Sequence, residues 1–133
     1  MLGEQIGGGQ GKRTARRVVS TASPFQIEVS FEDMTTLLGI QGMNIGTYVS
    51  GPKPDGSLYG TGQGVWATMD GDMATWTGLG IGRFGAAGSV SYRGCLSYTT
   101  TSAKLARLNG IAAVFEFEVD ASGNTTSKMW EWK

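Results

Sequence analysis

Histidine is absent from this sequence and there is a single cysteine, Cys95, so chemistry is left to arginine, tyrosine, tryptophan and the carboxylates. Ordinary zinc and copper sites need several imidazole or thiolate ligands, and catalytic triads and Cys–His pairs need an imidazole base. The composition therefore excludes these kinds of site, and we expect no metal and no cofactor. Without a histidine beside it, Cys95 is expected to be a small buried or interfacial thiol rather than a nucleophile.

Residues 80–85, Gly-Ile-Gly-Arg-Phe-Gly, match the G-x-G-x-x-G pattern of dinucleotide-binding proteins. That pattern binds phosphates only where a strand precedes it and a helix follows it, because the helix N-terminus receives the anion. No helical pattern follows residue 85, so we interpret these glycines as part of a β-hairpin.

Four residues are candidates for binding a ligand: Arg83, Tyr92, Tyr98 and Trp66. An arginine at the mouth of an apolar cavity can bind a carboxylate through two hydrogen bonds, whereas an arginine at a strand end reaches water or pairs with a glutamate. Aromatic side chains suit an apolar ligand, and they are equally typical of a filled core. For Arg83, ligand binding and a strand-end position both stay open, and for the three aromatic residues, ligand binding and core packing both stay open.

Other charged residues have two interpretations each. Glu116, Glu118 and Glu131 are expected on one face of a C-terminal hairpin. Carboxylates close together raise one another's pKa, which suits a general acid, but an exposed strand face explains the same residues without special chemistry. Arg93 is expected on the outside or in a subunit interface.

A basic cluster lies near the N-terminus. It consists of Lys12, Arg13, Arg16 and Arg17. Such a cluster can contact phosphate, and it can also protect an edge strand from aggregation. The chain has 11 Lys+Arg against 11 Asp+Glu, a net charge of zero, without the basic excess of nucleic-acid-binding proteins. We therefore expect no nucleic-acid partner.

The elements that must position these side chains are β-strands. Apolar and polar residues alternate over residues 25–32, 114–119 and 129–132, which is the period of a half-buried strand. We expect eight strands, over residues 12–20, 25–33, 37–49, 57–69, 73–84, 89–100, 110–120 and 124–132. Residues 102–108 are the only candidate for a helical turn, and we expect a loop there.

The turns fix which side chains share a face. We expect two-residue turns at residues 70–71 and 122–123 and a four-residue loop at residues 85–88. The resulting opposite pairs are Trp66 and Thr75, Ile81 and Tyr92, and Phe115 and Trp130. One face, expected to line the interior, carries Phe25, Ile27, Val29, Phe31, Phe115, Phe117, Trp130 and Trp132. Another shared face carries Leu79, Ile81, Val90, Tyr92, Leu96 and Tyr98, with Arg83 beside Ile81 and diagonal to Tyr92.

Glycine accounts for 22 of 133 residues. Alternating glycines at 60/62/64 and 78/80/82 fit tightly curved strands better than a flat sandwich. We therefore expect an all-β protein, a closed antiparallel barrel of about eight strands, as a single soluble domain over residues 1–133. Residues 1–11 are expected to be a flexible glycine-rich lead or a strand that needs a partner.

The sequence also carries expectations about location and assembly. It has no apolar run typical of a signal peptide or a membrane span, and only one cysteine, so we expect a cytoplasmic protein without a membrane partner. A net charge of zero favours self-association over repulsion. We expect a homo-oligomer.

Five segments carry a resemblance: residues 58–64, 71–78, 91–94, 104–110 and 130–133. Together they resemble a family of uncharacterised bacterial and archaeal small β-barrel proteins. More loosely, the glycine-broken strands and the Leu-x-x-Leu-Asn-Gly loop are similar to the allene-oxide-cyclase-like barrel group, which includes plant fatty-acid cyclases and bacterial polyketide cyclases. The resemblance implies an eight-stranded antiparallel barrel, often oligomeric, that sometimes holds a ligand in its lumen. It implies no catalytic residue, because no catalytic motif aligns.

Three function classes follow. The first is a binding module that encloses a small apolar or amphipathic ligand in its lumen, and we favour it. The second is a cyclase or isomerase that works without a cofactor by shaping its substrate. The third is a filled barrel that acts through its outer surface as an oligomer or a platform for a partner. Only the first two predict a cavity.

Overall fold

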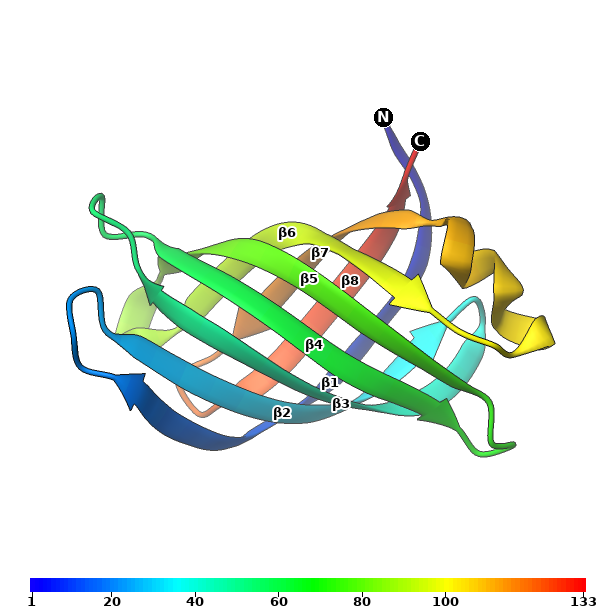
Figure 1. Ribbon diagram of the computed structural model, residues 1–133, viewed down its shortest axis with the longest axis horizontal. Coiled ribbons are helices and arrows are strands. Elements are labelled where there is room, and N and C mark those ends of the chain that lie inside the picture. Colours follow the sequence, from blue (N-terminus) through cyan, green and yellow to red (C-terminus); the bar gives the residue numbers. More distant parts are fainter.

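The computed structural model describes all 133 residues and shows eight strands that close into an antiparallel barrel. Each strand pairs with the next along the chain, and the last pairs with the first (Figure 1). The strands are β1 (Leu2–Ser20), β2 (Gln26–Leu37), β3 (Ile40–Pro52), β4 (Leu58–Thr68), β5 (Met73–Phe84), β6 (Val90–Thr99), β7 (Ala112–Val119) and β8 (Asn124–Trp132). Two 3₁₀ helices, η1 (Ala86–Gly88) and η2 (Ala103–Gly110), link β5 to β6 and β6 to β7. The predicted fold class is confirmed.

The first strand begins at Leu2, well before the expected start at residue 12. Over residues 7–12 it pairs with β2 on one side and with β8 on the other. Of the two alternatives for residues 1–11, the structure shows the strand with a partner, and the flexible lead is wrong. Glycine is needed here because strands approach closely: a Cβ on Gly9 would stand 2.5 Å from the carbonyl oxygen of Met34.

Three hairpins turn through three residues that end in a glycine with positive φ: Gly56, Gly71 and Gly123. In the β4–β5 turn, the Gly71 N–H donates to the Thr68 carbonyl at 3.1 Å, and the Thr68 N–H donates to the Asp72 carbonyl at 2.9 Å. This is the three-residue hairpin in which a tight turn is followed by a left-handed glycine. The expected two-residue turns at residues 70–71 and 122–123 are therefore wrong.

The loop between β5 and β6 is also one residue longer than expected. Each of these three longer connections shifts the pairing of the two strands that it joins by one residue. Trp66 pairs with Ala74, Ile81 with Arg93, and Phe115 with Met129. A slip of one residue exchanges the two faces of a strand. The three expected opposite pairs are therefore wrong.

The observed register divides the residues of the two expected faces into inward-facing and outward-facing ones. The residues that do face inward are Val29, Phe31, Phe115, Phe117, Val90, Tyr92, Leu96 and Tyr98. Leu79 and Ile81 instead point outward from β5, because inward positions there are held by glycines. Trp130 and Trp132 also leave the interior, since Met129 occupies the inner position. Phe25 precedes β2 and is 48% exposed.

The β2–β3 connection is the two-residue turn of the barrel. Leu38 and Gly39 both have positive φ, 50° and 80°, which defines the mirror-image turn that suits twisted hairpins. β2 therefore runs to Leu37 rather than to residue 33. Leu38 gives no turn signal in the sequence, and its side chain packs against the core.

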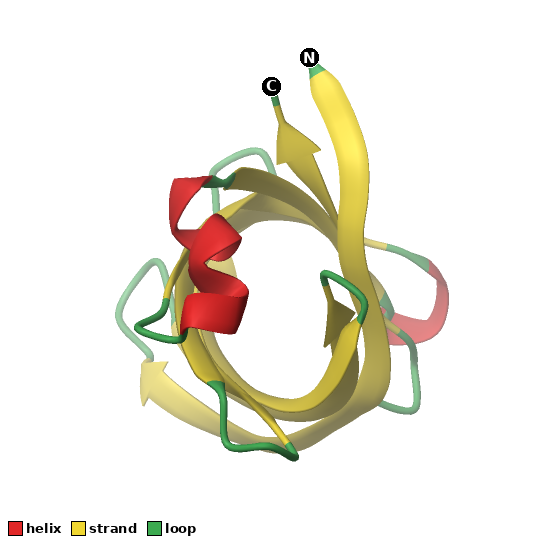
Figure 2. Ribbon diagram, turned by 90° about the vertical axis from the view of Figure 1, so that its right-hand side faces the viewer, coloured by secondary structure: helices red, strands yellow, loops and turns green.

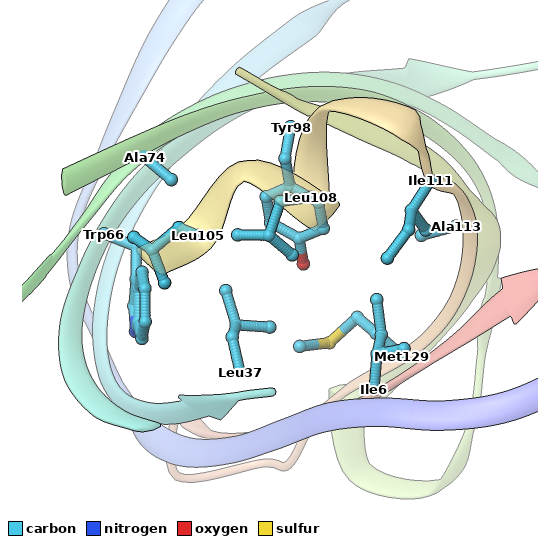
Figure 3. Packing of buried hydrophobic residues seen from close by; sticks show 10 residues of the cluster. All are labelled: Ile6, Leu37, Trp66, Ala74, Tyr98, Leu105, Leu108, Ile111, Ala113 and Met129. Atoms are coloured by element: carbon cyan, nitrogen blue, oxygen red, sulfur yellow. The ribbon is translucent and has the colours of Figure 1, made fainter. Parts of the chain in front are cut away.

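Helix η2 lies over one side of one end of the barrel (Figure 2). Leu105 and Leu108 are fully buried and point from η2 toward Leu37, Trp66 and Met129 (Figure 3). The expectation of a loop at residues 102–108 is wrong, because two leucines three residues apart give one apolar face to a short helix.

The opposite end is the mouth, framed by the β1–β2, β3–β4, β5–β6 and β7–β8 connections at the left of Figure 1. A cluster of aromatic side chains, here called the aromatic layer, lies just inside the mouth and consists of Phe31, Tyr48, Tyr92 and Phe117. Ring centroids are 4.9 Å apart for Phe31 and Phe117 and 5.5 Å apart for Tyr48 and Tyr92. The chain contains no helix with the length and hydropathy to cross a lipid bilayer.

Candidate functional site

A cavity of about 100 Å³ lies in the lumen, between the core packed under η2 and the aromatic layer at the mouth. Its wall is mostly apolar. Among the residues that line it are Trp66, Trp76, Leu96, Tyr98, Phe115 and Met129. Inner glycines at 60, 62, 78 and 80 contribute no side chain, so β4 and β5 leave the space that the aromatic residues of other strands border.

The wall has one polar cluster, formed by Asp33 and Thr35 on β2 and Asn44 on β3. Asp33 and Asn44 are direct cross-strand partners, and both point inward. The Thr35 hydroxyl donates to Asp33 Oδ1, and Asn44 Nδ2 donates to Asp33 Oδ2 at 3.3 Å. The Trp76 indole N–H in turn donates to Asn44 Oδ1 at 2.7 Å. The sequence therefore places a carboxyl group in the middle of an apolar lumen and holds it with neutral donors.

Asp33 is only 4% exposed and takes part in no ion pair. Burial raises the pKa of its carboxyl above the ordinary value, and the hydrogen bonds from Thr35 and Asn44 partly oppose that rise. A protonated carboxyl donates as well as accepts a hydrogen bond. Asp33 can therefore bind a neutral polar group or exchange a proton with it.

Two buried tyrosines border the same lumen. Burial raises the pKa of Tyr98, and the nearby charge of Asp33 raises it further. Burial likewise raises the pKa of Tyr92, whose hydroxyl lies 2.9 Å from Ser50 Oγ. Both phenols therefore stay neutral and act as hydrogen-bonding groups.

Three of the four sequence candidates line the cavity: Trp66, Tyr92 and Tyr98. Arg83 does not. It is exposed on the outer face of β5, opposite Ser91, and the expectation that it stands diagonal to Tyr92 at the lumen is wrong because the β5–β6 register differs by one residue. Its charge lies near Asp55 of the β3–β4 loop.

The structure brings other expected residues to different places. Arg93 lies outside, as expected, with ion pairs to Glu118 at 2.8 Å and Glu116 at 3.7 Å. Glu131 does not join those glutamates, because the shifted register places it near η2, where it pairs with Arg107 at 3.2 Å. Cys95 is exposed in the single chain, so the expectation of a buried thiol is wrong, and the alternative of an interfacial thiol stays a prediction.

The glycine pattern at residues 80–85 lies in β5 and the loop that follows it, as interpreted from the sequence. The residues that sequence reasoning missed are Asp33, Thr35 and Asn44. A signal for two of them exists, since the alternation that includes Phe31 continues through Asp33 and Thr35 to Leu37. The expected end of that strand at residue 33 hid it.

No family model and no curated protein matches this sequence. Solved structures match along nearly the whole chain. A protein of unknown function from Clostridium acetobutylicum has a TM-score of 0.83 at 11% identity, over 98% of this chain and 97% of that one. A beta-barrel like protein from Acinetobacter baumannii has a TM-score of 0.83 at 14% identity, over 100% and 96%. An enzyme from Penicillium herquei has a TM-score of 0.70 at 15% identity, over 96% and 92%.

These likenesses support the barrel fold alone, because all three identities are low. The chain is thus similar to small β-barrel proteins of unknown function. The likeness to the allene-oxide-cyclase-like group stays an expectation from the sequence.

Proposed function

We propose that the barrel binds a small, mostly apolar molecule in its lumen and holds one neutral polar group of that molecule against Asp33. The observation that supports this is a cavity of about 100 Å³ with an apolar wall and a single buried carboxyl that has no cation partner. A concave apolar site with few polar groups is the usual form of a small-molecule site. A buried carboxyl with a raised pKa is a common mark of a functional site.

The size and chemistry of the cavity restrict the ligand. An engineered apolar cavity of about 150 Å³ holds a benzene molecule. The lumen cavity of about 100 Å³ is smaller, so it suits a short chain better than a six-membered ring. A carbonyl or hydroxyl group suits Asp33, Tyr98 and Asn44, whose polar atoms offer both donors and acceptors. An anion beside Asp33 is disfavoured, because burial acts against any unpaired charge and the ionised form of Asp33 also repels it.

Titration with 1-hexanol tests the proposal. Trp66 and Trp76 both line the cavity, so we expect hexanol to change the tryptophan fluorescence and to raise the midpoint of thermal unfolding. In a Gly60→Leu variant the new side chain would fill the lumen, and both effects should disappear. No change in either signal up to the solubility limit of hexanol would contradict the proposal.

A second experiment separates binding from turnover. Native mass spectrometry of the freshly purified protein, followed by denaturation, would release a carried molecule for identification. A molecule recovered unchanged after incubation supports a binding module. A cyclised or isomerised product supports the cofactor-free cyclase, for which Asp33 is the residue placed to transfer a proton.

The outer surface supports an additional proposal, that a second copy of this chain covers an outer apolar band. The band consists of Met34, Met43, Ile45, Val65 and Met73. Met34 pairs with Met43 across β2 and β3, and Ile45 with Val65 across β3 and β4, so the side chains form one continuous surface. Each is between 38% and 54% exposed, and none is charged. Glu32, the β2 partner of Ile45, lies beside the band, whose own five residues are all apolar. An apolar surface of this kind on a chain of zero net charge fits a copy of itself.

A further inference from the structure

A bulge in β1 places two arginines on the same side of the strand. Arg13 pairs with Phe31, but Ala15 pairs with Ser30, so Thr14 is an extra residue in β1. In a regular strand, residues three apart point to opposite faces. The bulge removes this alternation, and Arg16 pairs with the inward-facing Val29.

Both arginines therefore lie on the same side of β1 as the inward-facing Phe31 and Val29, at the mouth, where Arg13 is half-buried and Arg16 is exposed. The pairing of β1 with β8 ends at Lys12, and the rest of β1 continues with β2 alone at the left end of Figure 1. The Arg13 guanidinium lies against Gly123, where an ideal Cβ would stand 3.3 Å from Nη2. The missing side chain of that glycine leaves room for it.

Arg16 lies next to the rim of the lumen. Its cross-strand partner Val29 pairs on its other side with Tyr48, whose ring belongs to the aromatic layer and lines the cavity. Burial raises the pKa of Tyr48, and the charges of Arg13 and Arg16 oppose that rise. The two cations are thus electrostatically coupled to a side chain of the lumen wall.

Neither guanidinium has an anionic partner within the chain. Arg17 pairs with Glu28 on the outer face, and Arg107 pairs with Glu131, but Arg13 and Arg16 form no ion pair and no side-chain hydrogen bond. The closest turn carries Asp120, whose carboxylate already accepts hydrogen bonds from Ser122 and Asn124. Two guanidinium groups on the same face of one strand, both without an anionic partner, can together bind an oxyanion.

We propose that Arg13 and Arg16 bind the anionic head group, a carboxylate or a phosphate monoester, of an amphipathic molecule whose apolar part lies in the lumen. This inference rests on the proposed lumen function and defines the ligand class more narrowly. The orientation of the ligand follows from charge. Asp33 disfavours an anion deep in the lumen, whereas the two arginines at the mouth attract one. The apolar part passes the aromatic layer, and its polar group reaches Asp33.

Calorimetric titration at pH 7.5 tests the inference with hexanoate, hexyl phosphate, 1-hexanol and inorganic phosphate. We expect hexanoate and hexyl phosphate to bind the wild-type protein. In an Arg13→Gln/Arg16→Gln variant their dissociation constants should rise roughly 10- to 100-fold, as for lost charge-assisted hydrogen bonds. Hexanol binding should not change. Arg83→Gln removes an unpaired arginine from the outer face and should alter none of these values.

The outcomes separate the inference from the proposed function. If hexanol binds and the double variant binds hexanoate as tightly as the wild type does, the head-group site is wrong and the lumen function stands. If none of the chain-bearing probes binds, both are wrong. If inorganic phosphate binds as tightly as hexyl phosphate, the arginines bind free anions and the amphipathic ligand is wrong. An Arg13→Lys/Arg16→Lys variant that recovers part of the affinity, with an unchanged thermal midpoint, shows that charge rather than folding was lost.

Discussion

At the scale of single residues, the main feature of the lumen is one carboxyl group, that of Asp33, in a buried and mostly apolar environment. Asp33 is almost fully buried, its neighbours Thr35 and Asn44 are neutral, and no cation compensates it. An ionised carboxylate in this place costs folding free energy, because hydrogen bonds from neutral groups replace only part of its hydration. This cost to stability is consistent with the proposed role of Asp33 in ligand binding.

Asp33→Asn tests this argument through the pH dependence of stability. Burial raises the pKa of Asp33 above 3.8, so the carboxyl lowers the free energy of unfolding as pH rises from that value through the raised pKa. The variant cannot ionise. We expect it to be more stable than the wild type at pH 8, by about 1 kcal/mol or more, and nearly equal to it at pH 4. Urea unfolding at the two pH values measures the difference, and an equal gap at both would contradict the argument.

At the scale of elements, the turns decide what the strands present to the lumen. An Asp-Gly or Ser-Gly pair fits a two-residue turn, and it also fits the last two positions of a three-residue turn that ends in a left-handed glycine. The residues 70–71 and 122–123 adopt the second form. Strand positions could be predicted from alternation, but the register could not, because the local sequence is compatible with both turns. Arg83 lies outside the site for a related reason, because the loop between β5 and β6 is one residue longer than expected.

The glycines of β4 provide a test within one strand. A Cβ on Gly64 would overlap the Trp76 indole, whereas the nearest atom to a Cβ on Gly60 is Cε1 of Tyr92 at 3.6 Å. We expect Gly64→Ala to lower the free energy of unfolding by about 3 kcal/mol through overpacking, and Gly60→Ala to change it by less than about 1 kcal/mol. Urea denaturation of both variants gives the comparison. Equal losses would show that the two inner positions are equally crowded.

Helix η2 is expected to hold its end of the barrel through its two leucines. Leu105→Ala or Leu108→Ala removes a fully buried side chain and should cost about 2 to 5 kcal/mol. Leu79→Ala is the matched control, since Leu79 is 43% exposed on the outer face of β5 and should cost less than about 1 kcal/mol. Thermal and urea unfolding measure both. A loss no greater for η2 than for the control would mean that the helix does not close the core.

At the scale of the whole molecule, the class of fold could be predicted because glycine frequency, strand spacing and alternation all act over many residues. The candidate site was predicted in part: Trp66, Tyr92 and Tyr98 are large aromatic residues wherever the register places them, and they line the lumen. Arg13 and Arg16 belonged to a visible basic cluster. The two side chains share one side of β1 only because of the bulge between them. Thr14 is not a residue type that indicates a bulge, so the sequence did not predict it.

The outer apolar band gives the prediction that belongs to the whole molecule. If a second copy covers the band, a charge at its centre must be left buried and unpaired in the assembly, which costs far more than in water. Met43→Glu should therefore dissociate the protein, while Thr126→Glu, an exposed change on β8, should not. In sedimentation velocity at tens of micromolar, we expect the wild type and Thr126→Glu to exceed the 14.0 kDa of one chain and Met43→Glu to match it. A wild type that sediments as a single chain would contradict self-association and leave the band uncovered.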